Sequence, residues 1–213
     1  LLKNDYVCKW IPSRPTPFNM KHHMDREVNS LINTGQIEKC GYSRWNSCVF
    51  LVKKPDGKSQ RLVQDLRQLN TQTLPDNFPL PRMDMIMNKM TDNNYLSVFD
   101  FLKGFVQIPL EEKSRPLTAF TFDDVRYQWS RLPQGQTNSS SQFARSMAIL
   151  FSNVPFQALI SYLDDILVGS KTVDEHLKRL RFIFQRLSWG NLKISPSKCQ
   201  LFKQEVKFLG HRI

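Results

Sequence analysis

Apolar positions along this chain of 213 residues follow two patterns. Where they recur three and four residues apart, they predict helices, and short runs rich in β-branched and aromatic residues predict strands. Because hairpins stand beside helices without regular strand–helix alternation, the order favours an α+β fold over a doubly wound parallel sheet. The predicted helices cover residues 21–34, 84–90, 140–151 and 173–189, and the predicted strands cover residues 49–53, 61–66, 95–101, 120–129 around a turn, 160–169 around a turn, and 206–211.

The most unusual stretch is residues 160–169, where Asp164 and Asp165 stand between two apolar runs. The two acids predict a tight hairpin turn. Its flanks lack the apolar/polar alternation of a half-exposed sheet, so we expect the hairpin to be buried. Two buried like charges cost several kcal/mol unless a cation neutralises them, and hard divalent ions such as Mg²⁺ bind carboxylate oxygens. An ordinary acidic turn is the alternative that this pattern leaves open.

A second acidic pair, Asp123 and Asp124, has different surroundings. The residues on both sides, 119–122 and 125–129, alternate between apolar and polar. This alternation is typical of a half-buried hairpin whose tip lies in solvent. We therefore assign no chemistry to this pair.

A third candidate acid, Asp100, ends the predicted strand between aromatic neighbours, where an unpaired carboxylate is costly. The sequence between Asp100 and Asp164 is long enough to hold a hairpin and a helix between two adjacent strands. If Asp100 meets Asp164 and Asp165, three carboxylates form a site for two divalent ions. Such ions can activate an attacking hydroxyl and stabilise a leaving pyrophosphate.

Cations cluster around the predicted hairpin of residues 49–66, whose turn is Pro55-Asp56-Gly57. Cations so placed can hold a triphosphate or a nucleic-acid backbone. They can equally protect a solvated sheet edge, and the pattern by itself favours that simpler interpretation. The cations are Lys53, Lys54, Lys58 and Arg61.

Composition narrows the class of protein. The length fits one large domain or two joined subdomains, and 40% hydrophobic residues suffice for a globular core. A formal net charge of +11 suits a polyanionic partner, nucleic acid first. No apolar run approaches the roughly 18 residues of a membrane span, so we expect no membrane association. The four cysteines lack metal-site spacing and suit a reducing compartment.

Six motifs in order give the sequence a nearly end-to-end resemblance to the reverse transcriptases of LTR retrotransposons and retroviruses, of the Ty3/gypsy-like or retroviral type. The resemblance implies a right-hand polymerase fold in which the palm is an antiparallel sheet backed by helices. It implies fingers at residues 1–75 and 108–138, and palm at residues 76–107 and 139–213. The motifs are residues 52–55, 61–70, Phe99-Asp100 with Gly104-Phe105, Leu132-Pro133-Gln134-Gly135, Tyr162-Leu163-Asp164-Asp165, and Phe208-Leu209-Gly210-His211.

The resemblance implies an RNA-directed DNA polymerase that uses two Mg²⁺ ions, replaceable by Mn²⁺. Asp100, Asp164 and Asp165 would be the catalytic, metal-binding carboxylates, and the backbone carbonyl of Phe101 would be a further ligand. Phe105 would be a steric gate that excludes ribonucleotides by shape.

Other positions would contact substrates. Lys54 and Arg61 match residues that close on the incoming triphosphate, and Lys198 matches a lysine near it. Gln134 and Gly135 match a loop beside the nascent base pair. Tyr162 would lie by the primer end, and the primer grip would comprise Phe208, Leu209, Gly210 and His211.

The implied partners are an RNA or DNA template, a primer strand and dNTPs, in an intracellular, cytoplasmic location that includes virus-like particles. No segment up to Ile213 matches a thumb, connection or RNase H domain, which the resemblance places in the full-length polyprotein. We therefore expect the isolated 213-residue chain to bind primer-template weakly. Residues 137–141 also depart from the family by lacking a proline near the helix start, where hydroxyl side chains can cap instead.

Two other functions are weighed against polymerisation. The chain could be a catalytically silent, domesticated scaffold that binds nucleic acid or protein, although its three carboxylates and Phe105 argue against decay. A polymerase of telomerase or bacterial retron type fits less well, because residues 61–70 and 208–211 favour the LTR group.

Overall fold

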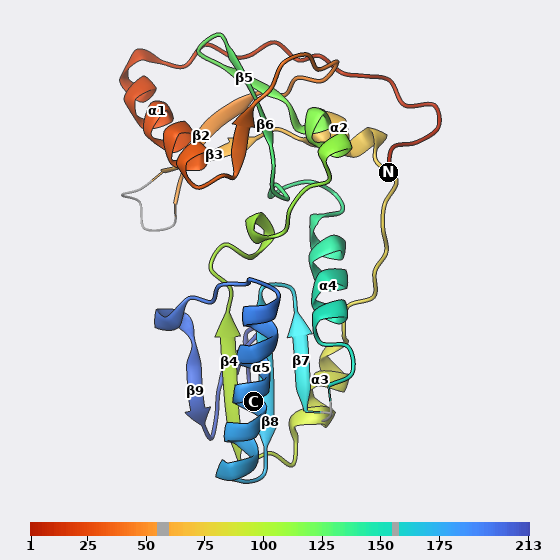
Figure 1. Ribbon diagram of the computed structural model, residues 1–213, viewed down its shortest axis with the longest axis vertical. Coiled ribbons are helices and arrows are strands. Elements are labelled where there is room, and N and C mark those ends of the chain that lie inside the picture. The colour runs from red at the N-terminus through yellow and green to blue at the C-terminus, as the bar shows by residue number, and fades with distance from the viewer. Residues whose placement is uncertain (55–59, 155–157) are drawn as a thin grey trace. The chain divides into compact units, whose positions relative to one another are not determined.

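The computed structural model describes residues 1–54, 60–154 and 158–213. The predicted turn at Pro55-Asp56-Gly57, together with Lys58, lies outside the described residues. The chain forms two compact units, each built from two separate segments (Figure 1). Unit 1 comprises residues 1–75 and 108–139, and unit 2 comprises residues 76–107 and 140–213.

Unit 1 contains a helix and two small antiparallel sheets. Helix α1, Phe18–Asn33, buries Met24, Val28 and Leu31, which confirms the predicted helix with a start three residues earlier. Gly35 follows at φ 64°, a conformation that suits glycine just after a helix. Strands β2 (Val49–Lys53) and β3 (Gln60–Gln64) form the predicted hairpin. The other sheet has the strand order β1 (Ile37–Lys39), β6 (Val125–Trp129), β5 (Phe120–Phe122). The unit also contains the short helices α2 (Arg67–Gln72) and η2 (Glu112–Thr118).

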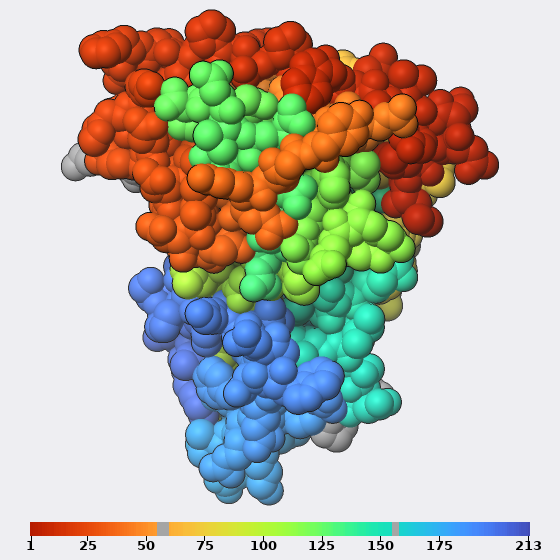
Figure 2. All heavy atoms as spheres, turned by 45° about the horizontal axis from the view of Figure 1, so that its top comes forward, coloured from red at the N-terminus to blue at the C-terminus, as the bar shows by residue number. Residues whose placement is uncertain are grey.

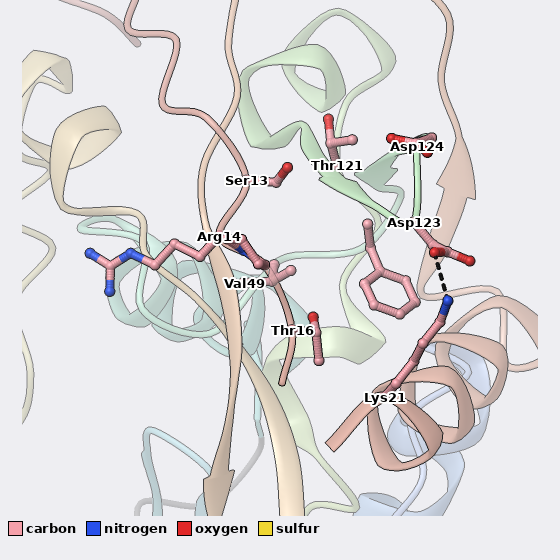
Figure 3. Close-up of a pocket in the computed structure, with 10 residues that line it drawn as sticks. Ser13, Arg14, Thr16, Lys21, Val49, Thr121, Asp123 and Asp124 are labelled. Atoms are coloured by element: carbon pink, nitrogen blue, oxygen red, sulfur yellow. Dashed lines mark hydrogen bonds and ion pairs between the residues drawn. The ribbon is translucent and has the colours of Figure 1, made fainter. Parts of the chain in front are cut away.

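The β5–β6 hairpin places Asp123 and Asp124 at its two-residue turn, because Phe122 pairs with Val125. Both aspartates have positive φ, as a type I′ turn requires. The hairpin lies at the surface of unit 1 beside the N-terminal segment (Figure 2). Asp123 pairs with Lys21 of α1 at 3.0 Å, whereas Arg14 extends away from that pair (Figure 3). The acidic pair thus occupies the expected hairpin tip.

Unit 2 is built on an antiparallel sheet with the order β7 (Leu159–Tyr162), β8 (Asp165–Ser170), β4 (Tyr95–Asp100), β9 (Gln200–Lys203). Ile166, Leu167 and Val168 of β8 are completely buried. A strand covered on both faces reads as a continuous apolar run, which explains the missing alternation in the sequence.

Helices cover both faces of this sheet. Helix α5, Val173–Trp189, packs on one face, where Phe184 contacts Phe99 edge-to-face (Figure 1). Thr172 caps its first turn by accepting a hydrogen bond from the Glu175 N–H. Helix α3, Met83–Met90, packs on the other face with Ile86 and Met90. Helix α4 (Ser139–Leu150) and the short helices η1 (Gly104–Gln107) and η3 (Pro196–Lys198) belong to the same unit apart from Ser139.

A buried histidine links α5 to the sheet. His176 Nε2 lies 2.7 Å from the Ser97 hydroxyl of β4, and Nδ1 lies 2.8 Å from the Ser170 hydroxyl of β8. Burial lowers the pKa of His176, which favours the neutral ring. The buried polar groups of Ser97, Ser170 and His176 therefore form hydrogen bonds with one another.

The prediction of one strand over residues 206–211 is wrong. Strands β10 (Lys207–Phe208) and β11 (His211–Arg212) form a small hairpin that reverses at Leu209 and Gly210, both at positive φ. Strands β1 and β9 were not predicted, because three or four residues carry no detectable periodicity. Among the described residues, no helix is long and apolar enough to cross a membrane.

Candidate active site

The strand register of unit 2 brings three aspartates together. Asp100, the last residue of β4, pairs with Asp165, the first residue of β8. One step further, the Phe101 N–H donates to the Asp164 carbonyl at 3.1 Å. The structure therefore places Asp100, Asp164 and Asp165 at the same end of the β4–β8 strand pair.

The turn beside these acids differs from the predicted Asp-Asp turn. Tyr162 pairs with Asp165, so the turn residues are Leu163 and Asp164, and Asp165 belongs to the strand. Leu163 has φ 47°, in a region that costs a non-glycine residue about 1–3 kcal/mol. A shift of one residue would move Ile166, Leu167 and Val168 to the opposite faces of the sheet, where each would meet a different helix, so packing on both faces opposes the shift.

Asp164 is the most constrained of the three acids. Its Oδ1 is buried and has no hydrogen-bond partner among the described residues. The same oxygen would lie 2.6 Å from a Cβ atom at Gly104, so only glycine leaves it room. Burial, followed by the charge of Asp100, raises the pKa of Asp164, while Lys198 opposes the rise.

Asp165 experiences similar forces. Burial is the largest cause that raises the pKa of its carboxyl, followed by the charges of Asp100 and Asp164. Lys198 again opposes the rise. The site therefore gathers more negative charge than its own residues neutralise.

Lys198 is the cation that contacts the acids. Its Nζ lies 3.1 and 3.3 Å from the two carboxylate oxygens of Asp100. The sequence predicted a lysine near a triphosphate, but no local pattern indicated this ion pair across 98 positions. The pairing depends on β9 lying beside β4.

The three carboxylates fit a hard divalent cation chemically, although their side chains do not surround a common metal position. Among the described residues, no group of three or more acidic, histidine or cysteine side chains is arranged around a common metal position. Asp100 contacts Lys198, and Asp164 lies against Gly104. An unpartnered buried oxygen and mutually repelling acids are nevertheless what such a cation would satisfy, since Mg²⁺ prefers oxygen ligands.

Aromatic residues form one wall of the site. Phe143 of α4 is completely buried and contacts the ring of Phe101 at 5.4 Å and that of Phe105 at 5.6 Å, both edge-to-face. Phe105, the predicted gate, is only partly buried. The sequence predicted the helix that carries Phe143 but not the contact of Phe143 with Phe105, which arises from the fold.

The predicted primer-contacting residues also belong to unit 2. Tyr162 ends β7 and packs, with Leu209, against a core cluster that contains Phe208. Phe208 is buried, whereas Gly210 and His211 are exposed. Only part of the predicted primer grip therefore faces solvent.

The remaining predicted site residues belong to unit 1. Lys54 and Arg61 are exposed, and Arg61 pairs with Val52 across the β2–β3 hairpin. Gln134 is exposed, and Gly135 has φ 91°. The Asn70 side chain fixes this loop, because its amide N–H donates to the Gly135 carbonyl and its oxygen accepts from the Thr137 N–H, each at 2.9 Å.

Solved structures of a foamy viral enzyme share this fold. The foamy viral protease-reverse transcriptase in complex with double-stranded DNA matches with a TM-score of 0.85 and 30% identity, over 98% of this chain and 36% of that chain. The same viral protein in complex with an RNA/DNA hybrid matches with a TM-score of 0.86 and 29% identity, over 100% and 28%. The fold is thus the right-hand polymerase fold, with fingers and an antiparallel palm.

The sequence identifies the family. The pattern described as "Reverse transcriptase (RNA-dependent DNA polymerase)" matches residues 52–213, and the chain belongs to that family. The retrovirus-related Pol polyprotein from transposon 297 of Drosophila melanogaster is 36% identical over 94% of this chain. The polyprotein from transposon 412 of the same organism is 38% identical over 92%. The chain spans only 20% and 16% of these two relatives.

Proposed function

We propose that this chain is the fingers-and-palm core of an enzyme that adds dNTPs to a primer 3′-OH on an RNA or DNA template. The observation that carries this proposal is the β4–β8 register, which sets Asp100 opposite Asp165 and beside Asp164. Three partly buried carboxylates at one end of a strand pair are costly unless cations neutralise them. A fold without a cation-binding role has no reason to place them together. Family membership and the solved complexes of related proteins support the same activity.

The acids would hold the metal ions. Asp100, Asp164, Asp165 and the Phe101 carbonyl supply oxygen ligands for two Mg²⁺ ions, with Mn²⁺ as a substitute. When bound, two such ions stabilise the attacking and leaving oxygens of an in-line phosphoryl transfer. The protein itself contributes mainly the positions of the reacting groups.

Other residues of unit 2 would select and orient the substrates. The Phe105 ring, packed against Phe143, excludes a ribose 2′-OH by shape. Tyr162 lies by the primer end, and residues 208–211 hold the primer strand. Lys198 contributes positive charge near the triphosphate.

Unit 1 would supply the fingers. We assign residues 1–75 and 108–138 to the fingers and residues 76–107 and 139–213 to the palm, a division supported by the two compact units. Lys54 and Arg61 are exposed, which suits contact with a triphosphate, and Gln134 and Gly135 lie in a loop fixed by Asn70. Thumb and RNase H domains are expected elsewhere in the polyprotein, in a cytoplasmic or virus-like particle setting.

Primer extension tests this proposal. The 213-residue chain and a longer polyprotein that contains it are given a DNA primer on an RNA template, with dNTPs and Mg²⁺. We expect extension that EDTA abolishes and that Asp100→Asn removes. Nucleic-acid binding without extension by the longer protein would refute the activity and favour the silent scaffold.

A further inference from the structure

The ion pair between Lys198 and Asp100 is held by the main chain on both sides of the lysine. Before it, the Ser195 N–H donates to the Asp100 carbonyl at 2.8 Å, and the Lys198 N–H returns to the Ser195 carbonyl at 3.0 Å. After it, Gln200 pairs with Val98 of β4. Lys198 therefore stands on a short bridge whose two ends are attached to the strand that carries Asp100.

This attachment distinguishes Lys198 from an ordinary surface lysine. Exposed ion pairs are usually weak, partly because two long side chains must give up their freedom. Here the backbone already places the ammonium group near the carboxylate, although the lysine side chain is still 65% exposed. The backbone of Lys198 is thus held in place, while its side chain is exposed to solvent and can move away from Asp100.

Two further acids lie beside the one that Lys198 contacts, because Asp165 pairs with Asp100 across β4 and β8 and the Asp164 carbonyl accepts from the Phe101 N–H. A single positive charge balances only part of three negative charges. A divalent cation would balance them better, but it would meet Lys198 at the Asp100 carboxylate.

We propose that Lys198 is a tethered counter-ion, which holds Asp100 while no divalent cation is bound and leaves that carboxylate when one binds. Metal binding is then an exchange of one cation for another at the same oxygens. The released ammonium group becomes available to an anionic group such as a phosphate. This inference rests on the proposed function only in taking the three acids as the divalent-cation site.

The proposal fixes the sign of two measurable effects, because coupling between two binding events is reciprocal. If a metal ion displaces Lys198, then Lys198 must weaken the binding of that ion. Removing its charge should tighten Mn²⁺ binding about two- to fivefold, the range expected for a partly exposed ion pair. It should also lower the metal-free Tm by about 1–3 °C.

The experiment compares Lys198→Met with the wild-type chain. Mn²⁺ affinity is measured by titration followed by electron paramagnetic resonance, and Tm is measured in EDTA. Lys203→Met is the matched control, because Lys203 is an exposed lysine on the adjoining strand β9 and should change neither value. Lys198→Arg should restore the metal-free Tm. In an Asp100→Asn background, Lys198→Met should no longer lower it.

The outcomes separate the two proposals. Tighter Mn²⁺ binding and a lower metal-free Tm for Lys198→Met alone support the counter-ion role. Unchanged or weaker Mn²⁺ binding in that variant overturns it, while primer extension by the wild type would leave the proposed function standing. A wild-type chain that binds no Mn²⁺ at millimolar concentration overturns the exchange and the metal site together.

Discussion

The β5–β6 and β7–β8 hairpins each carry two adjacent aspartates at a two-residue turn, yet the turns differ in register by one residue. In the first, Asp123 and Asp124 are both turn residues, and neither pairs with a residue of the opposite strand. In the second, Asp164 is a turn residue but Asp165 belongs to the strand, and β4 adds Asp100 beside it. The second hairpin therefore places one of its acids opposite an acid of another strand, whereas the first keeps both acids at its turn.

Burial separates the two hairpins further. The Asp123 side chain is 59% exposed and pairs with Lys21. Asp164 and Asp165 are half-buried, and burial is the main cause that raises the pKa of each. The surroundings of the two acidic pairs, and not the pairs themselves, therefore distinguish the two hairpins.

The largest expected contrast is in catalysis. Asp164→Asn should reduce primer extension about a thousandfold or more, because it removes a charge that several kcal/mol of transition-state stabilisation depend on. Asp123→Asn makes the same chemical change in the other hairpin and should retain wild-type rates. Circular dichroism would verify that both variants fold. Comparable activity of the two variants would remove the distinction between the hairpins.

A glycine substitution tests whether the Asp164 carboxylate must stay where it lies. Gly104→Ala would bring a Cβ within 2.6 Å of Asp164 Oδ1. Displacing a reacting group by about 1 Å can cost roughly a hundredfold in rate, so we expect a loss of that order in steady-state extension. Gly41→Ala is the control, since a Cβ there meets no atom within 4 Å. Equal rates for both variants would show that Asp164 does not need this position.

The two hairpins should also respond oppositely to charge removal in stability measurements. The pKa of the Asp164 carboxyl is higher in the folded chain than its unfolded value of 3.8. Such a carboxyl destabilises the folded state as the pH rises from the unfolded pKa through the folded pKa. Asp164→Asn in EDTA should therefore raise Tm by roughly 2 °C at pH 7, and the gain should vanish near pH 3. Asp123→Asn loses its ion pair with Lys21, so its Tm should fall slightly or stay constant. A lower Tm for Asp164→Asn at pH 7 would contradict the argument.

The smallest expected effect concerns the solvated turn. Asp124 has φ 59° at the second position of a type I′ turn, where glycine is preferred. Asp124→Gly should raise Tm by about 1–2 °C in differential scanning calorimetry, as relief of mild backbone strain predicts. Asp124→Ala keeps the strain and loses the tolerance of aspartate for this region, so it should lower Tm. A destabilised glycine variant would show that the Asp124 side chain itself supports the turn.

Sequence patterns predicted much of this fold because the relevant signals are local. The helices over residues 21–34 and 173–189 were predicted from neighbouring residues alone, and α1 and α5 confirm both. The distinction between the two acidic hairpins was also local, since it rested on alternation in the flanking strands. The roles of the site residues stay predictions.

Other features depend on residues far apart in the sequence and left no local trace. The Lys198–Asp100 pair needs β9 to lie beside β4, and β9 has only four residues. The turn consists of Leu163 and Asp164, because Asp165 pairs with Tyr162 as part of β8. The turn propensity of the Asp-Asp pair predicts a different register, since it takes no account of how β8 packs. Gly104 was predicted only as part of a motif with Phe105, whereas the fold requires glycine there to leave room for the Asp164 carboxylate.

The position of β4 in its sheet has a consequence for the newborn chain. This strand lies between β8 and β9, yet both neighbours are translated much later, from residues 165 and 200 onward. At the ribosome, the apolar residues 96, 98 and 99 must therefore wait with both edges of β4 unpaired until β8 emerges, and with one edge unpaired until β9 follows. Long-range pairing of this kind is slow and exposes strands to aggregation. Chaperone capture of nascent chains should accordingly concentrate between the synthesis of β4 and that of β9, which ribosome-bound fragments of graded length would reveal.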